Sequence, residues 1–240
     1  MPHTDARDLD ELETEIVGCC ACPRLVAWRE VVARERRAAF RDETYWGKPV
    51  PGFGDRRARV LLVGLAPAAH GGNRTGRVFT GDRSGDFLFA SMFRTGYANQ
   101  PESTGLRDGL RLRDSYIAAA VRCAPPANKP TPAERDECRP FLAREIELLT
   151  RVRVIVALGA FGYEAAWSVL KTGVHPGVEL PARRPRFGHG LEVRCGRMTI
   201  LGTFHPSQQN TFTGRLTPAM LDAVFERARY LTSASTSPTA

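Results

Sequence analysis

Continuous apolar runs recur along this chain at intervals that suit the strands of a buried sheet. Residues 59–65 and 152–159 are almost entirely apolar, which is typical of parallel strands covered on both faces. Residues 115–123 show the same pattern. Residues 191–206 predict a hairpin that turns at Cys195 and whose second arm is another core strand.

Stretches with helical periodicity separate these strands. They cover residues 8–17, 25–42, 84–96, 130–150, 161–171 and 217–233. Ser84 can cap the third of them, and Thr131 followed by Pro132 can cap and open the fourth. Glycine and proline concentrate in residues 45–55 and 175–190, which we predict to be loops.

Strands that alternate with helices predict an α/β fold in which helices cover both faces of a parallel sheet. Ligands in such folds bind beyond the carboxyl ends of the strands. The loops after Leu65, Cys123 and Phe204 fall at those ends, and they are the most distinctive stretches of the chain. No repeat or linker divides the sequence, so we expect one domain over residues 1–232 and a disordered tail over residues 233–240.

The composition narrows the class of protein. Among 240 residues, 34 Lys and Arg against 26 Asp and Glu give a net charge of +8. Nearly all of the cations are arginine, which pairs bidentately with phosphate, although codon composition can produce the same bias. The excess charge favours a nucleic-acid partner. The acidic N-terminus does not resemble a secretory signal, and no run of about 18 apolar residues could span a membrane, so we expect a cytoplasmic protein.

Four of the six cysteines form two spaced pairs. Cys19 and Cys22 make a C-x-x-C pair, while fourteen residues separate Cys123 from Cys138. Four thiolates can bind a zinc ion or a [4Fe–4S] cluster, and we favour the cluster because only one pair has the knuckle spacing of a zinc ribbon. The alternative is a set of buried, inert thiols. The two remaining cysteines, expected to be ordinary thiols, are Cys20 and Cys195.

Two further motifs identify a family. GLAPAAHGGNRTGRVFTGDRSG spans residues 64–85, and FHPSQQNTFTGRLT spans residues 204–217. Together with the cysteine spacing, they resemble the uracil-DNA glycosylase superfamily, and within it the iron–sulfur enzymes of family 5. The resemblance implies a three-layer α/β/α sandwich around a four-stranded parallel sheet. It also implies a [4Fe–4S] cluster, whose ligands would be Cys19, Cys22, Cys123 and Cys138.

The resemblance implies an activity as well. Such an enzyme hydrolyses the N-glycosidic bond of a damaged base in duplex DNA and leaves an abasic site for base excision repair. It must extrude the nucleotide into a pocket, stack its base and stabilise the charges that develop. Phe79, in VFTG, matches the phenylalanine that stacks on uracil, and His205, in HPS, matches the histidine that donates to the uracil O2. Ala68 and His70 are expected to contact the base from the loop after the first strand.

That loop departs from the superfamily pattern. Many members place a carboxylate there to hold the attacking water, whereas this chain has Leu65 and Ala66. The catalytic polar group must then lie elsewhere, and the candidates are Asp82, in TGD, and Asn128, in PPANKP. Each also has a purely structural interpretation, Asp82 as a helix cap and Asn128 as a turn residue.

A second departure concerns base recognition. Related enzymes carry an asparagine in the second strand that reads the uracil edge, and Ala119 stands in that place here. Without this amide a strong discriminator is lost. We therefore predict a broad specificity that covers uracil, hypoxanthine, xanthine and ethenocytosine. The alternative within the enzyme class is a family 4-type glycosylase that is narrowly specific for uracil.

The segment 206–215 is expected to enter the minor groove and to fill the gap left by the flipped nucleotide. The residues expected to contact DNA are Asn73, Arg74, Arg77, Gln208, Gln209, Asn210 and Arg215. No lysine nucleophile lies near the motifs, so we expect a monofunctional hydrolase. We also expect the protein to be a monomer that is associated with the nucleoid. The rival from another class is a non-catalytic iron–sulfur or zinc module that binds DNA and releases no base.

Overall fold

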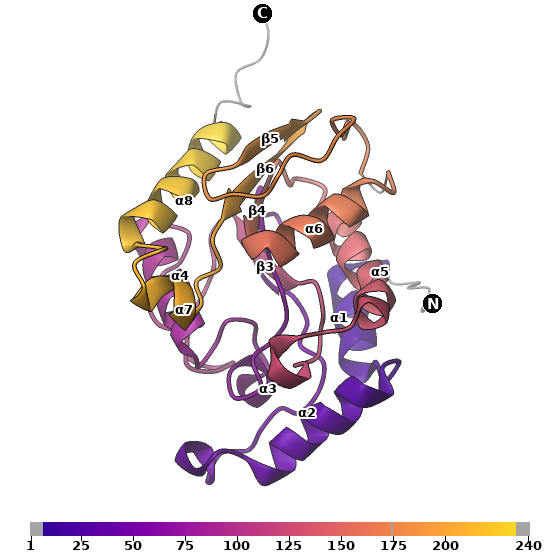
Figure 1. The fold of residues 1–240 in the computed structure, drawn as a ribbon, viewed down its shortest axis with the longest axis vertical. Helices are drawn as coiled ribbons and strands as arrows, with labels where there is room; N and C mark the ends of the chain where they lie inside the picture. Colours follow the sequence, from indigo (N-terminus) through magenta and orange to yellow (C-terminus); the bar gives the residue numbers. More distant parts are fainter. Residues whose placement is uncertain (1–6, 174, 234–240) are drawn as a thin grey trace, which may run out of the picture.

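A six-stranded mixed sheet forms the centre of the computed structural model, which describes residues 7–173 and 175–233 (Figure 1). In sheet order the strands are β1 (Phe53–Gly54), β3 (Ser115–Ala119), β2 (Val60–Gly64), β4 (Val154–Leu158), β6 (Met198–Thr203) and β5 (Glu192–Cys195). The four inner strands are parallel, while β1 and β5 pair antiparallel at the edges. The predicted four-stranded parallel sheet is therefore the centre of a larger sheet, and β1 lies in a stretch that we expected to be a loop.

Helices cover both faces of this sheet. They are α1 (Leu9–Gly18), α2 (Pro23–Glu35), α3 (Gly72–Thr75), α4 (Arg83–Arg94), α5 (Pro132–Leu148), α6 (Gly159–Leu170), α7 (Gln208–Phe212) and α8 (Pro218–Ser233), with the short 3-10 helices η1 (Ala38–Phe40) and η2 (Pro126–Asn128). Helix α8 packs on α4, β4 and β6, and α6 packs on β2, β4 and β6. Figure 1 shows α4 and α8 on one side of the sheet and α1, α5 and α6 on the other, which is the predicted three-layer arrangement.

The central strand β2 shows why these runs are apolar throughout. Val60 and Leu62 join the core beneath α4 and α8, whereas Leu61 and Val63 join the core beneath α5 and α6. All four side chains are fully buried, each worth roughly 1.5–3 kcal/mol of transfer free energy. A strand that is covered on both faces needs apolar residues at every position.

Two predicted helix boundaries differ from the observed ones. Helix α2 ends at Glu35, short of its predicted end, because Arg36 leaves the helical region, with a φ of 57° and a ψ of 167°. Helix α4 is capped by Asp82 and not by Ser84. Thr131 caps α5 as predicted, within a capping box.

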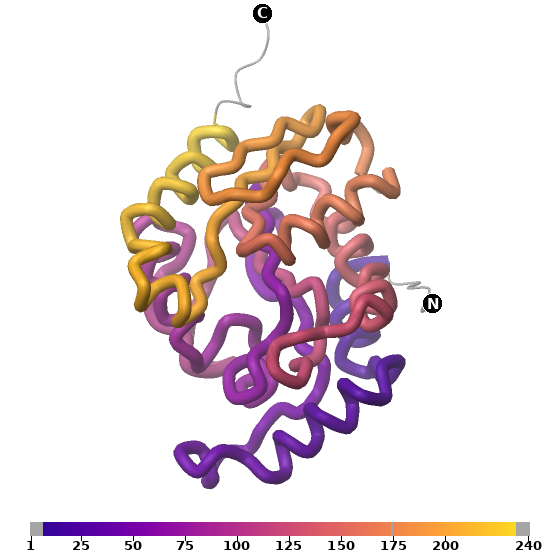
Figure 2. The backbone as a smooth tube through the Cα atoms, in the orientation of Figure 1, coloured from indigo at the N-terminus to yellow at the C-terminus, as the bar shows by residue number. Residues whose placement is uncertain are grey.

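The loops after β2, β3 and β6 converge at the carboxyl ends of the parallel strands. They contain α3, η2 and α7, respectively, and Figure 2 traces all three toward the same region of the molecule. The sheet topology thus places the two sequence motifs and the second cysteine pair at one end of the domain.

The remaining described segments are a loop and the end of the last helix. The predicted loop over residues 175–190 forms no helix or strand in its described part. Within residues 7–173 and 175–233, no helix is long and apolar enough to cross a membrane. Ser233 closes α8, and the rest of the predicted tail, residues 234–240, lies outside the described residues.

Candidate active site

A cleft of about 710 Å³ opens where the three loops meet. Its lining residues are Arg37, Phe40, Ala68, Ala69, His70, Gly71, Arg74, Gly81, Asp82, Arg83, Asp86, Asn128 and Gln208. Six of these were predicted site residues, drawn from all three loops. A more apolar groove of about 450 Å³, between α8 and the β5–β6 edge, contains none of them. We therefore place the candidate active site in the cleft.

Phe79 and His205 form a ring pair, and neither residue is among those that line this cleft. Their centroids are 5.7 Å apart, with an angle of 34° between the ring planes. Gly64, at the end of β2, makes room for Phe79, since a Cβ there would lie 2.8 Å from its Cε2. Phe79 has a φ of 52°, a left-handed conformation that costs about 1–3 kcal/mol. Strain of this kind, under a half-buried ring, is typical of a residue held in place for a ligand.

The imidazole of His205 is neutral at physiological pH. Dense packing around the ring lowers its pKa to about 4, although the side chain keeps some contact with solvent. The backbone around it is fixed, because Asn210 Nδ2 donates to the His205 carbonyl at 2.9 Å. A neutral imidazole in this position can donate one hydrogen bond to a developing anion.

Asp82 caps helix α4 and also lines the cleft. Its Oδ1 accepts a hydrogen bond from the Gly85 N–H at 2.9 Å and so caps α4. Its Oδ2 faces Gly71, where a Cβ would lie only 2.2 Å away. Burial raises the pKa of Asp82, while the backbone N–H groups of Gly85 and Ser84 oppose that shift. The predicted cap role is thus observed, and it fixes the carboxylate beside the cleft.

His70 and Asn128 supply the other polar side chains predicted for the pocket. His70 Nδ1 shares a hydrogen bond of 3.0 Å with the Tyr45 hydroxyl. Desolvation lowers the pKa of His70, and the positive charges of Arg37 and Arg74 add to the effect. Asn128 is exposed and left-handed, with a φ of 55°, a conformation that asparagine tolerates. Both side chains line the cleft.

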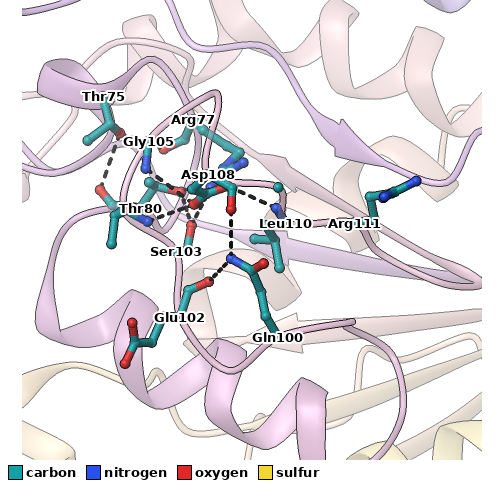
Figure 3. A network of polar contacts seen from close by, with 12 residues as sticks. Thr75, Arg77, Thr80, Gln100, Glu102, Ser103, Gly105, Asp108, Leu110 and Arg111 are labelled. Carbon is teal, nitrogen blue, oxygen red and sulfur yellow. Dashed lines mark hydrogen bonds and ion pairs between the residues drawn. The ribbon is translucent and has the colours of Figure 1, made fainter.

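Three residues that we predicted at the DNA surface lie inside the protein. Asn73, Arg74 and Arg77 are 1%, 8% and 3% exposed. Arg77 pairs with Asp108, as Figure 3 shows, and Arg74 pairs with Glu43. Asn73 Nδ2 donates to the Arg29 carbonyl at 3.2 Å. All three side chains therefore make contacts inside the protein, and of the three only Arg74 also lines the cleft.

The segment after His205 presents polar side chains to solvent. Gln208 and Gln209 are exposed, and Gln208 lines the cleft. Asn210 is bound into the local turn, since its carbonyl accepts from the Leu216 N–H at 2.9 Å. Arg215 is exposed and stacks on the Phe204 ring, with its guanidinium carbon 4.4 Å from the centroid.

Sequence patterns alone did not single out four further residues at this surface. Phe212, at the end of α7, is an aromatic side chain with 75% exposure. Arg37, Phe40 and Arg83 line the cleft. Arg37 and Phe40 lie there because α2 stops at Glu35, a break that no proline or glycine announces in the sequence.

The two predicted cysteine pairs come together. Cys22, Cys123 and Cys138 belong to one small cluster with Leu25 and Val121. Burial raises the pKa of Cys22 to about 12 and that of Cys123 and Cys138 to about 11. Charge on the neighbouring thiols, Cys19 among them, raises these pKa values further.

The four thiols are the donors that the sequence predicts for a cluster. Across the described ranges, no three His, Cys, Asp or Glu side chains converge closely enough to hold one metal ion. A [4Fe–4S] cluster takes four thiolate ligands. The four thiols match its ligand set in type and number, and the cluster itself stays a prediction.

Arg29 places a positive charge beside these sulfurs. It is 3% exposed, and its Nη1 lies 3.0 Å from the Cys123 Sγ while its Nη2 lies 3.6 Å from the Cys20 Sγ. Its Nε lacks a hydrogen-bond partner within the described residues. A buried guanidinium needs a nearby negative charge. Thiolates that ligate iron would supply that charge.

Comparison with known proteins agrees with this geometry. The family described as "Uracil DNA glycosylase superfamily" matches residues 51–229. The chain is 53% identical to a type-5 uracil-DNA glycosylase of Mycobacterium tuberculosis, over 94% of this chain and 82% of the relative. It is 48% identical to the type-5 enzyme of Thermus thermophilus, over 93% and 98%. Identity to a type-4 uracil-DNA glycosylase of Thermotoga maritima is 38%, over 66% and 69%.

Proposed function

The chain belongs to the uracil-DNA glycosylase superfamily and to its type-5 members, and we propose that it removes uracil and other deaminated or modified bases from duplex DNA. The observation that carries this proposal is the shared cleft: Ala68, His70, Asp82, Asn128 and Gln208 line it together. We place the Phe79–His205 ring pair beside it, because Gly81 and Gln208 of the lining follow the two rings closely in the chain. A flipped base needs such an aromatic surface, a hydrogen-bond donor and a fixed carboxylate within one cavity.

We assign the ring pair to the leaving base. Phe79 would stack on the extruded base, an interaction that tolerates many bases because each has a π-face. His205 would donate its N–H to the base oxygen as negative charge builds there. Its lowered pKa keeps the ring neutral, so the donor does not have to pass a proton to the base. Ala68 and His70 would complete the wall around the base.

We assign Asp82 to the attacking water and the sugar cation. Since Oδ1 is bound by the Gly85 N–H, the side chain cannot rotate freely, and Oδ2 keeps a fixed place beside Gly71. A carboxylate held in this way can accept a hydrogen bond from water and stabilise positive charge on the sugar. Asn128 is a second polar group for the water, on the loop after β3. No lysine takes part, which leaves hydrolysis without a lyase step.

We attribute a broad base range to Ala119. It ends β3, pairs in register with Gly64 of β2, and is 2% exposed in the same core that Phe79 packs against. Its methyl group offers no hydrogen bond to the edge of a base, so uracil, hypoxanthine, xanthine and ethenocytosine meet no polar discriminator there. A narrow uracil specificity is the alternative, and it would require another residue to read the base edge.

We propose that Cys19, Cys22, Cys123 and Cys138 hold a [4Fe–4S] cluster. The group would serve as a covalent tie and would contribute no redox step to hydrolysis. This chain supplies a buried cation, Arg29, to balance its negative charge. The tie would join the start of α2 to α5 and so fix the N-terminal segment next to the loop that carries Asn128.

We propose that the protein meets DNA through the exposed part of the segment 206–215. Gln208, Gln209 and Asn210 remain candidates to fill the gap left by the flipped nucleotide, and Arg215 remains a candidate phosphate contact. Phe212 is an apolar side chain of the kind that other proteins insert between base steps. In this proposal the buried side chains of Asn73, Arg74 and Arg77 hold the shape of the loop and do not contact DNA. We propose a monomer that acts at the nucleoid.

The test is the release of a free base. The full-length protein is incubated with duplexes that carry uracil, hypoxanthine, xanthine or ethenocytosine at one position, and the released bases are separated and measured. We expect each base to be released and the strands to stay intact until alkali is added. Strand cleavage without alkali would contradict the monofunctional assignment.

A further inference from the structure

A buried ion pair includes Arg77, which lies two residues before Phe79 in the chain. Arg77 and Asp108 pair with side-chain exposures of 3% and 8%, as the network in Figure 3 shows. Arg77 belongs to the loop after β2, and Asp108 to the segment between α4 and β3. Asp108 also accepts from the N–H groups of Thr104 and Leu110, at 2.8 and 3.0 Å. The pair therefore fastens one segment to the other.

The hydroxyls of Thr80 and Ser103 extend this network to the residue that follows Phe79. Arg77 Nε donates to Thr80 Oγ1 at 3.0 Å, and its Nη2 donates to Ser103 Oγ at 2.8 Å. The two hydroxyl oxygens are 2.6 Å apart, and Thr80 and Ser103 are 0% and 3% exposed. The N–H of Gly81 donates to the Ser103 carbonyl at 3.0 Å. Phe79 thus sits between anchored neighbours.

Phe79 itself needs such restraint. Its φ of 52° belongs to a region that an aromatic residue leaves readily when nothing holds it. Thr80 Oγ1 also donates to the Val78 carbonyl at 3.2 Å, which bridges the residues on either side of Phe79. The Phe79 carbonyl packs so tightly on Gly85 that a Cβ there would lie 1.8 Å from it. The strained turn is therefore enclosed by the network and by α4.

We propose that Asp108 is a positioning residue for base stacking, which acts through Arg77, Thr80 and Ser103 to hold Phe79 in its left-handed conformation. The inference rests on the proposed function, because it takes Phe79 to be the platform for the extruded base. The carboxylate of Asp108 touches neither base nor sugar, since Arg77 and backbone N–H groups occupy both of its oxygens. Its effect on the reaction reaches the base only through the geometry of Phe79.

The network stays charged under working conditions. Burial acts to raise the pKa of Asp108, but the Arg77 hydrogen bond and the backbone N–H groups outweigh it and hold the pKa at about 2. The amide in Asp108→Asn keeps an oxygen that can accept from the backbone N–H groups. It removes the negative charge that pairs with the Arg77 guanidinium. Ser103→Ala removes one hydroxyl and changes no charge, so it serves as a milder second variant.

A double-mutant cycle tests the proposal. Uracil release from duplex DNA is measured under single-turnover conditions for the wild type, Asp108→Asn, Phe79→Ala and the double variant. We expect Asp108→Asn to slow release about tenfold and to leave affinity for the duplex within about threefold. In the Phe79→Ala background, the same change should cost less than about twofold, because the platform is already gone. Ser103→Ala should follow the same pattern with a smaller loss.

Asp114→Asn is the matched control. Asp114 also pairs with an arginine, Arg59, and accepts its N–H at 2.9 Å, but at the other end of β2. We expect this variant to release uracil at the wild-type rate. If the losses from Asp108→Asn and Ser103→Ala were the same with and without the Phe79 ring, the positioning role would be wrong. It would also be wrong if neither variant slowed release. Either result would leave the proposed function intact. A wild type that releases no uracil, or a fully active Phe79→Ala, would overturn the proposed function and this inference with it.

Discussion

The rings of Phe79 and His205 lie 5.7 Å apart, although one follows the first parallel strand and the other follows the last of the four. The contact exists because β2 and β6 both flank β4 and point the same way. Their carboxyl ends therefore bring the two motif loops to the same end of the sheet. Phe79 is strained and His205 is neutral, two properties that suit a site for stacking and hydrogen bonding to a base.

The capping contact of Asp82 allows catalysis to be separated from folding. Asparagine caps a helix about as well as aspartate, so Asp82→Asn should keep the Gly85 contact and the melting temperature. We expect uracil release to fall by about 10²-fold, since the amide carries no negative charge toward the water or the sugar. Asp8→Asn, at the N-cap of α1, is the control and should be fully active. Wild-type rates for Asp82→Asn would remove this residue from the mechanism.

His205 makes the stability of the protein depend on pH. The folded chain keeps the ring neutral down to about pH 4, whereas an unfolded histidine binds a proton near pH 6.5. Between these values the unfolded state binds more protons, so the contribution of the neutral ring is present above about pH 6.5 and is lost as the pH falls toward 4. From pH 7 to 5 the wild type should lose about 1–2 kcal/mol more unfolding free energy than His205→Gln. Urea titrations of both proteins measure this difference, and equal losses would contradict the buried neutral ring.

The cysteine assignment predicts different outcomes for two buried thiols. Cys138→Ser should lose bound iron and the brown colour of the protein, and its melting temperature should drop by about 5 °C or more. Cys195→Ser, in the hairpin of β5 and β6, should keep its iron. Iron analysis and thermal unfolding of both variants provide the readout. If Cys138→Ser left folding and DNA binding intact, the cluster could not be a structural tie.

Affinity for duplex DNA should fall steeply with salt, because phosphate contacts release counterions. Arg215→Gln should lower the slope of log Kd against log salt concentration by about 1. The control is Arg227→Gln, on α8, where Arg227 is already paired with Glu192. Binding titrations between low and moderate salt measure these slopes. A flat response of the wild type would rule out a phosphate-dominated interface.

Strands and caps were predictable because their signals are local. Residues 60–64 are apolar at every position because both faces of β2 are covered. Thr131 and Glu134 form the capping box of α5 within one helical turn. The edge strand β1 escaped prediction since two residues carry no period, and its pairing with β3 depends on the rest of the sheet.

The surroundings of the arginines could not be predicted from the motifs. An arginine in a glycine-rich loop looks the same in sequence whether it faces phosphate or a buried carboxylate. Arg77 is buried because Asp108, thirty-one residues further along the chain, folds back onto it. Arg37 reaches the cleft because Arg36 adopts a non-helical conformation that nothing in its side chain requires.

Broad base specificity is tested most simply by comparing uracil with hypoxanthine in the same duplex sequence. The protein, with its iron content measured, is mixed in excess with otherwise identical duplexes that carry uracil or hypoxanthine, and abasic sites are converted to strand breaks with alkali. We expect strand scission with both bases, because Ala119 offers no group that reads the base edge. Scission with uracil alone would contradict the broad specificity. No scission with either base, in protein that binds its full iron, would contradict the enzyme and leave a DNA-binding module.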